Sequence, residues 1–92
     1  MAVEVRFDAD RSRWEAADGA EIVGVADVRV QGDRVIFTHT FVSPARRGQG
    51  IAERLVAAGL DDVRARGAVA VPHCWYVAEF MAEHPEYADL AL

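Results

Sequence analysis

The chain has 92 residues, of which 52% are hydrophobic, with 15 acidic and 10 basic side chains and a net charge of −5 at pH 7. This length predicts a single domain over residues 1–92, with enough apolar residues for a packed interior. An acidic chain lacks the basic surface typical of nucleic-acid-binding proteins, so we expect no nucleic acid partner. All the basic residues are arginines, which excludes lysine Schiff bases and the Walker phosphate loop.

Cysteine usage and hydropathy indicate the compartment. The single cysteine, Cys74, cannot form an intramolecular disulfide, which favours a reducing cytoplasm. No apolar run approaches the roughly 18 residues of a membrane-spanning helix, and residues 1–6 have no signal-peptide pattern. We therefore expect a cytoplasmic protein with no membrane partner, present as a monomer or a weak dimer.

The first half of the sequence predicts about four antiparallel strands. Val3–Phe7 alternates apolar and charged residues with the period of a strand, and Arg11–Ala17 is a second short strand that Asp18-Gly19 ends in a hairpin turn. Gln31-Gly32-Asp33 separates a third strand from a fourth, Arg34–Val42, which is rich in β-branched and aromatic residues. Alternation places these residues of the third strand on one face: Ile22, Gly24, Ala26, Val28 and Val30.

The second half changes to a helical period. Apolar residues at 52, 55, 56, 59, 60 and 63 form one stripe of a helix that ends at Gly67. Ala68–Val71 predicts a buried strand ended by Pro72, and Trp75–Glu83 predicts a second helix. The order β-β-β-β-α-β-α indicates an α+β fold, a mostly antiparallel sheet with helices packed on it. The last two strands are expected to be parallel, because a helix connects them.

The junction Phe41–Ala52 is the candidate binding element. An apolar strand ends near Pro44, a loop with Arg46, Arg47 and two glycines follows, and an amphipathic helix begins. Free N–H groups at a helix start beside arginines suit a phosphate. The alternative is an ordinary strand-to-helix turn whose backbone angles need glycine. The dinucleotide-binding fingerprint is excluded, because Glu53 stands where that motif needs a third glycine or small residue.

The segment Arg47–Ala52, with the pattern Arg-x-x-Gly-x-Ala, resembles the acyl-coenzyme-A loop of GNAT-superfamily N-acetyltransferases, which also lies between a strand and the long central helix. Together with His39-Thr40, Pro72-His73-Cys74 and His84-Pro85-Glu86-Tyr87, it makes nearly the whole chain similar to a short, single-domain branch of that superfamily. The resemblance implies a minimal acyl-CoA N-acyltransferase fold. It also implies acetyl-CoA as co-substrate and acetyl transfer to an amine, for which a protein or peptide amine is one candidate.

The resemblance also implies how coenzyme A would be held. The backbone amides of residues 47–52 would bind the diphosphate, beside Arg46 and Arg47. The strand end would pair with the pantetheine arm, and the strand at 69–71 would diverge to leave a slot for that arm. The candidate cofactor-binding residues are Phe41, Val42, Arg46, Arg47, Gly48, Gln49, Gly50, Ile51 and Ala52.

Three side chains are candidate catalytic residues. Cys74 follows the last strand and would either accept the acetyl group or line the site during direct attack by an amine; the alternative is a buried structural cysteine. His39 suits a general base, since histidine changes its charge near neutral pH. By strand alternation His39 shares a face with Phe37 and Phe41, so a packed core residue is an equal alternative. Tyr76 could donate a proton to the departing thiolate, or pack as a core or rim residue.

The remaining polar residues bear on metal binding, and the short connection between the first two strands bears on the acceptor site. The histidines and Cys74 show no zinc-binding spacing, so we expect no metal. His84-Pro85-Glu86-Tyr87 is expected to cap the last helix and pack the C-terminal segment. Only Asp8-Ala9-Asp10 separates the first two strands, where larger members of the superfamily carry helices that build the acceptor site. A second hypothesis is therefore a coenzyme-A-binding or protein-interaction module with little or no turnover.

Overall fold

The computed structural model describes residues 3–91. Its helices and strands confirm the predicted order and add two short 3-10 helices, η1 and η2. In chain order the elements are β1 (Val3–Asp8), β2 (Arg13–Asp18), β3 (Glu21–Gln31), β4 (Arg34–Val42), η1 (Pro44–Arg46), α1 (Ile51–Arg66), β5 (Val69–Pro72), α2 (Trp75–Glu83) and η2 (Pro85–Leu90).

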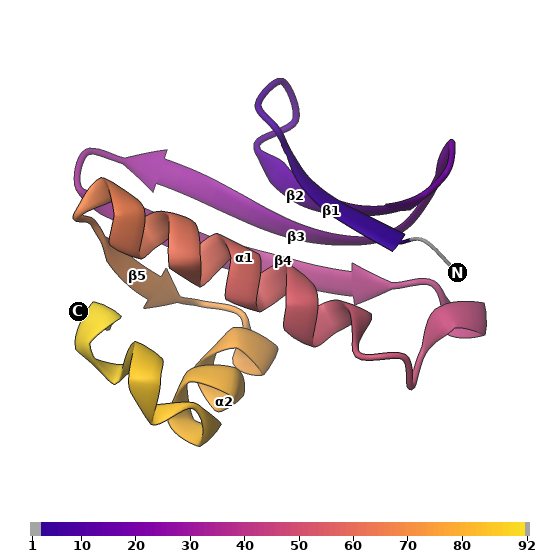
Figure 1. The fold of residues 1–92 in the computed structure, drawn as a ribbon. Helices are drawn as coiled ribbons and strands as arrows, with labels where there is room; N and C mark the ends of the chain where they lie inside the picture. Colours follow the sequence, from indigo (N-terminus) through magenta and orange to yellow (C-terminus); the bar gives the residue numbers. More distant parts are fainter. Residues whose placement is uncertain (1–2, 92) are drawn as a thin grey trace.

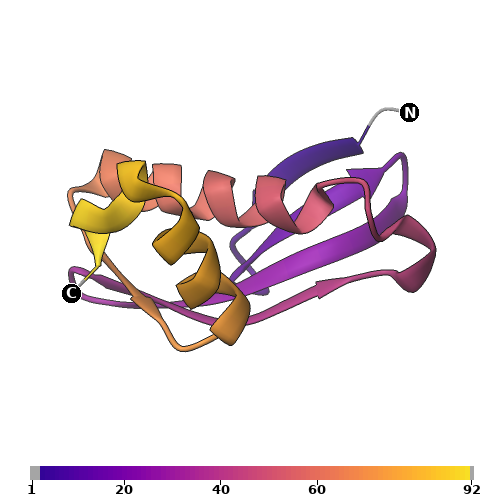
Figure 2. The same cartoon turned by 90° about the horizontal axis from the view of Figure 1, so that it is seen from below.

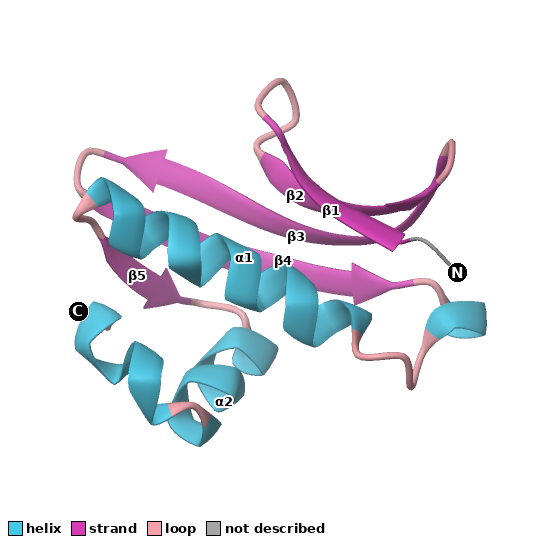
Figure 3. Ribbon diagram, viewed as in Figure 1, coloured by secondary structure: helices cyan, strands magenta, loops and turns pink. Residues whose placement is uncertain are grey.

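The strands form a single five-stranded sheet in the order β1-β2-β3-β4-β5. The pairs from β1 to β4 are antiparallel, whereas β4 and β5 are parallel. This confirms the mostly antiparallel sheet and the parallel last pair that the sequence predicted. The sheet is curved, with β1 and β2 curling away at one end and β5 at the other edge (Figure 1 and Figure 3).

Both long helices pack on one face of the sheet. The predicted apolar stripe of α1 is buried, and residues of α1 and α2 join Val35 and Phe37 of β4 in one core cluster. Gly59 is required where α1 crosses β4, because a Cβ there would lie 2.7 Å from the Phe37 ring. Figure 2 shows α1 lying along the sheet.

None of the helices in residues 3–91 is both long and apolar enough to cross a membrane.

A β-bulge in β4 changes which side chains face the helices. Asp27 pairs with His39, whereas the next residue of β3, Val28, pairs with Phe37, so Thr38 is the extra residue. Phe37 is only 1% exposed, while His39 lies on the surface. The prediction that His39 shares a strand face with Phe37 is therefore wrong, and so is the alternative of a packed core histidine, because a bulge reverses the alternation of the residues that follow it.

A second bulge lies in β3. Ala16 pairs with Gly24 and Ala17 with Ile22, so Val23 is the extra residue. Val23 is 1% exposed and joins the core cluster beneath the start of α1, whereas Ile22 is only half-buried. The prediction that Ile22 lies on the same face of the strand as Gly24 is therefore wrong, for the same geometric reason.

Candidate functional site

The parallel pair β4–β5 opens towards the C-terminal end of β4. Strand pairing stops at Phe37 and Pro72, although β4 continues to Val42. Pro72 has no N–H to extend the ladder, and the Cys74 N–H donates to the Phe37 carbonyl (2.9 Å) as the chain turns into α2. Residues 38–42 of β4 thus have no β5 partner, which confirms the predicted divergence of the two strands.

The start of α1 carries no side-chain cap. Gly50 is the N-cap residue, with φ 75° and ψ 17°, and no side chain accepts from the first turn. Gly48 also has a positive φ of 82°. A Cβ at Gly48 would meet nothing within 4 Å, so the backbone angle rather than lack of space favours glycine there. The first N–H groups of a helix have no intrahelical acceptor, and together with the helix dipole they favour an anion.

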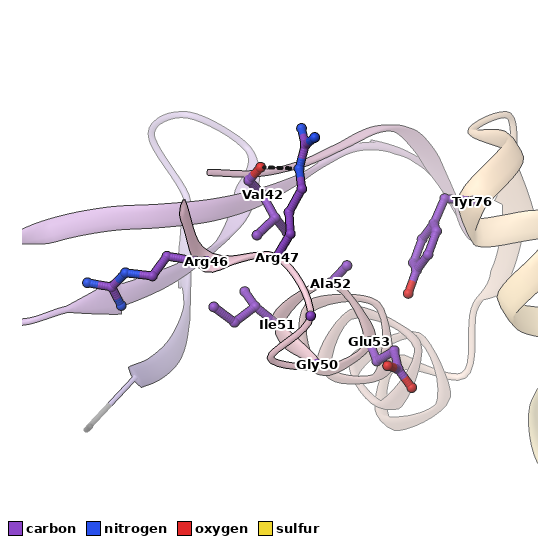
Figure 4. A pocket seen from close by; sticks show the side chains of 9 residues that line it. Val42, Arg46, Arg47, Gly50, Ile51, Ala52, Glu53 and Tyr76 are labelled. Atoms are coloured by element: carbon purple, nitrogen blue, oxygen red, sulfur yellow. Dashed lines mark hydrogen bonds between the residues drawn. The ribbon is translucent and has the colours of Figure 1, made fainter. Parts of the chain in front are cut away.

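The two arginines of the loop have different surroundings (Figure 4). The Arg46 guanidinium pairs with Asp18 at 2.9 Å and with Glu21 at 3.5 Å, which ties η1 to the turn between β2 and β3. Arg47 donates from Nε to the Val42 carbonyl (3.3 Å) and is exposed. Arg46 therefore holds the loop in place, whereas Arg47 directs its charge beside the end of β4.

A continuous groove begins at this helix start. A pocket of about 260 Å³ lies between the loop and the first turn of α1. A larger pocket of about 580 Å³ follows residues 38–42 of β4 and residues 73–76 at the start of α2. The two pockets share Val42, Arg47, Ala52 and Tyr76. We refer to them together as the groove; it runs from the N-terminus of α1 to Cys74.

The groove brings together nearly all of the predicted site residues. The candidate cofactor-binding residues line it, with the exception of Gln49, which is exposed in the loop. The candidate catalytic residues His39, Cys74 and Tyr76 all line the larger pocket. Residues that are up to 37 positions apart in the sequence, from His39 to Tyr76, thus meet in one place.

Cys74 and Tyr76 form the α2 side of the groove. The half-buried Cys74 thiol lies 3.7 Å from the Thr40 hydroxyl across the slot and can donate to it. Burial, followed by the charges of Glu53, Glu83 and Glu79, raises the pKa of the Tyr76 hydroxyl. Tyr76 therefore keeps its proton at neutral pH. Its hydroxyl points towards the first turn of α1 (Figure 4).

Four polar residues of the groove were not among the predicted site residues: Thr38, Thr40, Glu53 and His73, the neighbour of Cys74. Thr38 lies there because of the bulge, for which the sequence carries no signal. The sequence could have indicated Thr40 and Glu53. Thr40 lies two residues before Val42, on the same side of the strand, and Glu53 belongs to the first helical turn after Gly50. Among residues 3–91, no three His, Cys, Asp or Glu side chains are grouped so that they could hold a metal ion.

The segment His84–Tyr87 lies outside the pocket at Cys74 and packs the end of the chain. His84 follows α2, with Nδ1 2.7 Å from the Phe80 carbonyl and its ring stacked on the Phe80 ring at 3.9 Å. The Tyr87 hydroxyl donates to Asp61 of α1 (2.9 Å). These contacts confirm the predicted capping and packing role.

A small mixed sheet whose parallel pair opens beside a glycine loop and a helix N-terminus defines an acyltransferase-like class of fold. Residues 13–90 match the family model described as GCN5-related N-acetyl-transferase. The chain belongs to this family, as the resemblance of its loop indicated.

Curated relatives and solved structures agree with this family. Protein NATD1 of Bos taurus is 34% identical over 85 residues, which cover 88% of this chain and 75% of the relative. Protein NATD1 of Danio rerio is 39% identical over 98 residues, covering 100% of this chain and 89% of the relative. A GCN5-like protein from Staphylococcus aureus, solved by NMR, has a TM-score of 0.77 at 20% identity and covers 97% of this chain and 87% of its own.

A larger enzyme shares part of the fold. The ribosomal-protein-S18-alanine N-acetyltransferase from Escherichia coli gives a TM-score of 0.60 at 19% identity, and the alignment covers 67% of this chain but only 41% of that enzyme. The two proteins therefore share part of one fold, and more than half of the larger enzyme lies outside the aligned part.

Proposed function

We propose that the protein is an acetyl-CoA-dependent N-acetyltransferase that transfers an acetyl group to an amine. The observation that carries this proposal is the groove, because it joins an uncapped helix start to an unpaired strand edge and then to a set of proton-transfer groups. Each part suits a different part of acetyl-CoA.

The diphosphate suits the start of α1. The N–H groups of the first turn and the Arg47 guanidinium offer hydrogen bonds and positive charge at one end of the groove. The pantetheine arm contains amides and is extended, so it can pair with the free edge of β4 at Phe41 and Val42 as an added strand would. This arrangement leaves the thioester in the larger pocket beside Cys74 and Thr40.

The chemistry we propose is direct attack by the amine. The amine nitrogen forms a bond to the thioester carbon, the carbon–sulfur bond then breaks, and the thiolate leaves with coenzyme A. Tyr76, whose raised pKa keeps it protonated, can return a proton to that thiolate, and the exposed His39 can take the proton that the amine loses. Cys74 then lines the pocket; in the alternative route its thiolate accepts the acetyl group first.

Calorimetric titration with acetyl-CoA tests the proposal, and we expect binding of one ligand per chain. No detectable binding at millimolar ligand would contradict it. The Cys74→Ala variant separates the two routes. We expect the variant to retain acetyl transfer, and we expect intact mass measurement to find no acetylated form of the wild-type protein during turnover. Loss of transfer in Cys74→Ala, together with acetylated wild-type protein, would show the covalent route instead.

A second candidate function is a coenzyme-A-binding module with little turnover. The connection from β1 to β2 consists of residues 9–12 only, so no helix between these strands covers the acceptor side. Binding of acetyl-CoA without acetylation of any amine in a broad screen would favour this function.

A further inference from the structure

The acceptor end of the groove is flanked by two exposed aromatic side chains. Trp75, in the first turn of α2, is 74% exposed, and Phe41, on the free edge of β4, is 48% exposed. They are the most exposed large apolar side chains of residues 3–91, and both line the larger pocket. Exposed aromatic side chains at the mouth of a pocket are typical of a recognition surface.

The surface continues along α2 as an acidic stripe. Glu79 and Glu83 follow Trp75 at i+4 and i+8, which places the three residues on one side of the helix. All three are exposed, and α2 contains no basic residue. We call this row of one tryptophan and two glutamates, Trp75, Glu79 and Glu83, the acidic stripe. Its charge reaches Tyr76 of the groove, because burial and the charge of Glu53, and after them the charges of Glu83 and Glu79, raise the pKa of the Tyr76 hydroxyl.

The two ends of the groove differ in electrostatic character. The start of α1 combines its first N–H groups with Arg47, which lines both pockets, and favours an anion although Glu53 also lines the smaller pocket. The exposed rings of Trp75 and Phe41 and the carboxylates of Glu79 and Glu83 favour a cation. An indole ring attracts an ammonium group through its face and packs against an aliphatic stem. A carboxylate one helical turn away from that ring can accept a hydrogen bond from the same ammonium or a neighbouring one.

We propose that the acceptor is a basic polypeptide segment that docks along the acidic stripe. Its acceptor amine enters the groove between Trp75 and Phe41, and neighbouring lysine or arginine side chains lie against Glu79 and Glu83. The stripe spans two helical turns, about 12 Å, which corresponds to about four residues of an extended chain. A polypeptide can contact this whole length while its amine reaches the thioester. This inference names the acceptor class of the proposed acetyl transfer and rests on that function.

Peptide binding in the absence of acetyl-CoA tests the docking surface separately from catalysis. The probe is a fluorescein-labelled ten-residue glycine-serine peptide with lysines at every second position, compared with the same peptide carrying glutamines. We expect fluorescence anisotropy at low salt to show about tenfold tighter binding of the lysine peptide, an effect of about 1.4 kcal/mol. Glu79→Arg should abolish this preference, and Trp75→Ala should weaken binding of the lysine peptide.

Glu4→Arg is the matched control, because it makes the same charge change at an exposed position of β1, far along the sheet from α2. Equal binding of the two peptides, or equal losses in Glu79→Arg and Glu4→Arg, would overturn the proposal. Spermine can be added so that it supplies the same concentration of positive charges as the peptide. Displacement of the peptide by spermine would also overturn the proposal, since the surface would then bind any polycation and would not require a polypeptide. Should Trp75→Ala fail to fold, Trp75→Leu tests the aromatic ring with a similar apolar side chain.

Transfer and docking can fail separately. Peptide binding without acetyl transfer would contradict the proposed enzymatic function and leave the docking surface supported. Transfer to small amines with no preference for the lysine peptide would support the enzyme and overturn the docking surface.

Discussion

The two ends of α1 each have a glycine in the left-handed region, yet their surroundings differ. At the C-terminal end Gly67 has φ 68° and ψ 27°, and its N–H donates to the Arg64 carbonyl, while the Ala68 N–H donates to the Val63 carbonyl, each at 3.1 Å. At the N-terminal end Gly50 has nearly the same angles, but no side chain caps the helix and a pocket lies there instead. The same local conformation closes one end and leaves the other available to a ligand.

The side chains around the two ends follow the same division. Near the C-terminal end, Arg64 donates to both carboxylate oxygens of Asp89 at 2.9 Å and to the Glu86 carbonyl at 2.7 Å. Near the N-terminal end, Arg47 has an exposed guanidinium beside the groove. The helix start with no side-chain cap and the exposed Arg47 guanidinium, which bonds only through Nε to the Val42 carbonyl among the contacts described above, indicate where a ligand binds.

Alanine at each glycine gives the sharpest test of this contrast and the largest expected effect. Because alanine is strained at a positive φ, both Gly50→Ala and Gly67→Ala should lower the free energy of unfolding by about 1 kcal/mol. Only Gly50→Ala should weaken acetyl-CoA binding, by about tenfold or more, because it shifts the first turn of α1. Chemical denaturation and calorimetry measure the two quantities. Equal affinities in the two variants would remove the functional difference between the ends.

The arginines offer a second contrast. Arg47→Ala should weaken acetyl-CoA binding by about tenfold, the value of a charge-assisted hydrogen bond, and should reduce the dependence of affinity on salt. Arg46→Ala should instead lower stability, because Arg46 pairs with Asp18 and Glu21.

Arg66→Ala is the control for the arginine at the closed end, where Arg66 pairs with Asp62; we expect its affinity to match the wild type. A larger loss of affinity in Arg46→Ala than in Arg47→Ala would mean that Arg46, rather than Arg47, contacts the diphosphate.

The pair between Arg64 and Asp89 gives the smallest expected effect. The hydrogen bond and charge of Arg64 lower the pKa of Asp89, so the stabilisation is present at neutral pH and is lost as the pH falls through that lowered value. Asp89→Asn should therefore reduce the melting temperature slightly at pH 7, and the two proteins should converge in strong acid. Acetyl-CoA affinity should not change. A melting difference that persists in acid would show that the charge of Asp89 is not its cause.

The sequence predicted best what depends on local pattern. Local patterns were enough to predict the order of the helices and strands and the parallel pairing of the last two strands. These patterns are the glycine turns at residues 19, 32 and 67, the apolar stripe of α1 and the strand–helix–strand order. The glycine loop was found for the same reason, because its special backbone angles are local to Gly48 and Gly50.

Bulges and long-range partners could not be predicted from pattern. β4 has three consecutive apolar residues, Val35–Phe37, so either phase of alternation was consistent with a buried face, and the bulge at Thr38 decides it. Asp18, which pairs with Arg46, lies 28 positions before it, and Asp61, which accepts from Tyr87, lies 26 positions before it. Such contacts depend on packing of the whole fold, which leaves no local signal in the sequence.

Amide chemical shifts of the 15N-labelled protein during titration with acetyl-CoA test the central claim most directly. We predict large shifts for residues 48–53 at the open end of α1 and for Phe41 and Val42 on the free edge of β4. Gly67 and Ala68 at the closed end should not shift. Shifts centred on Gly67, or no shifts at millimolar acetyl-CoA, would contradict the assignment of the groove as the coenzyme A site.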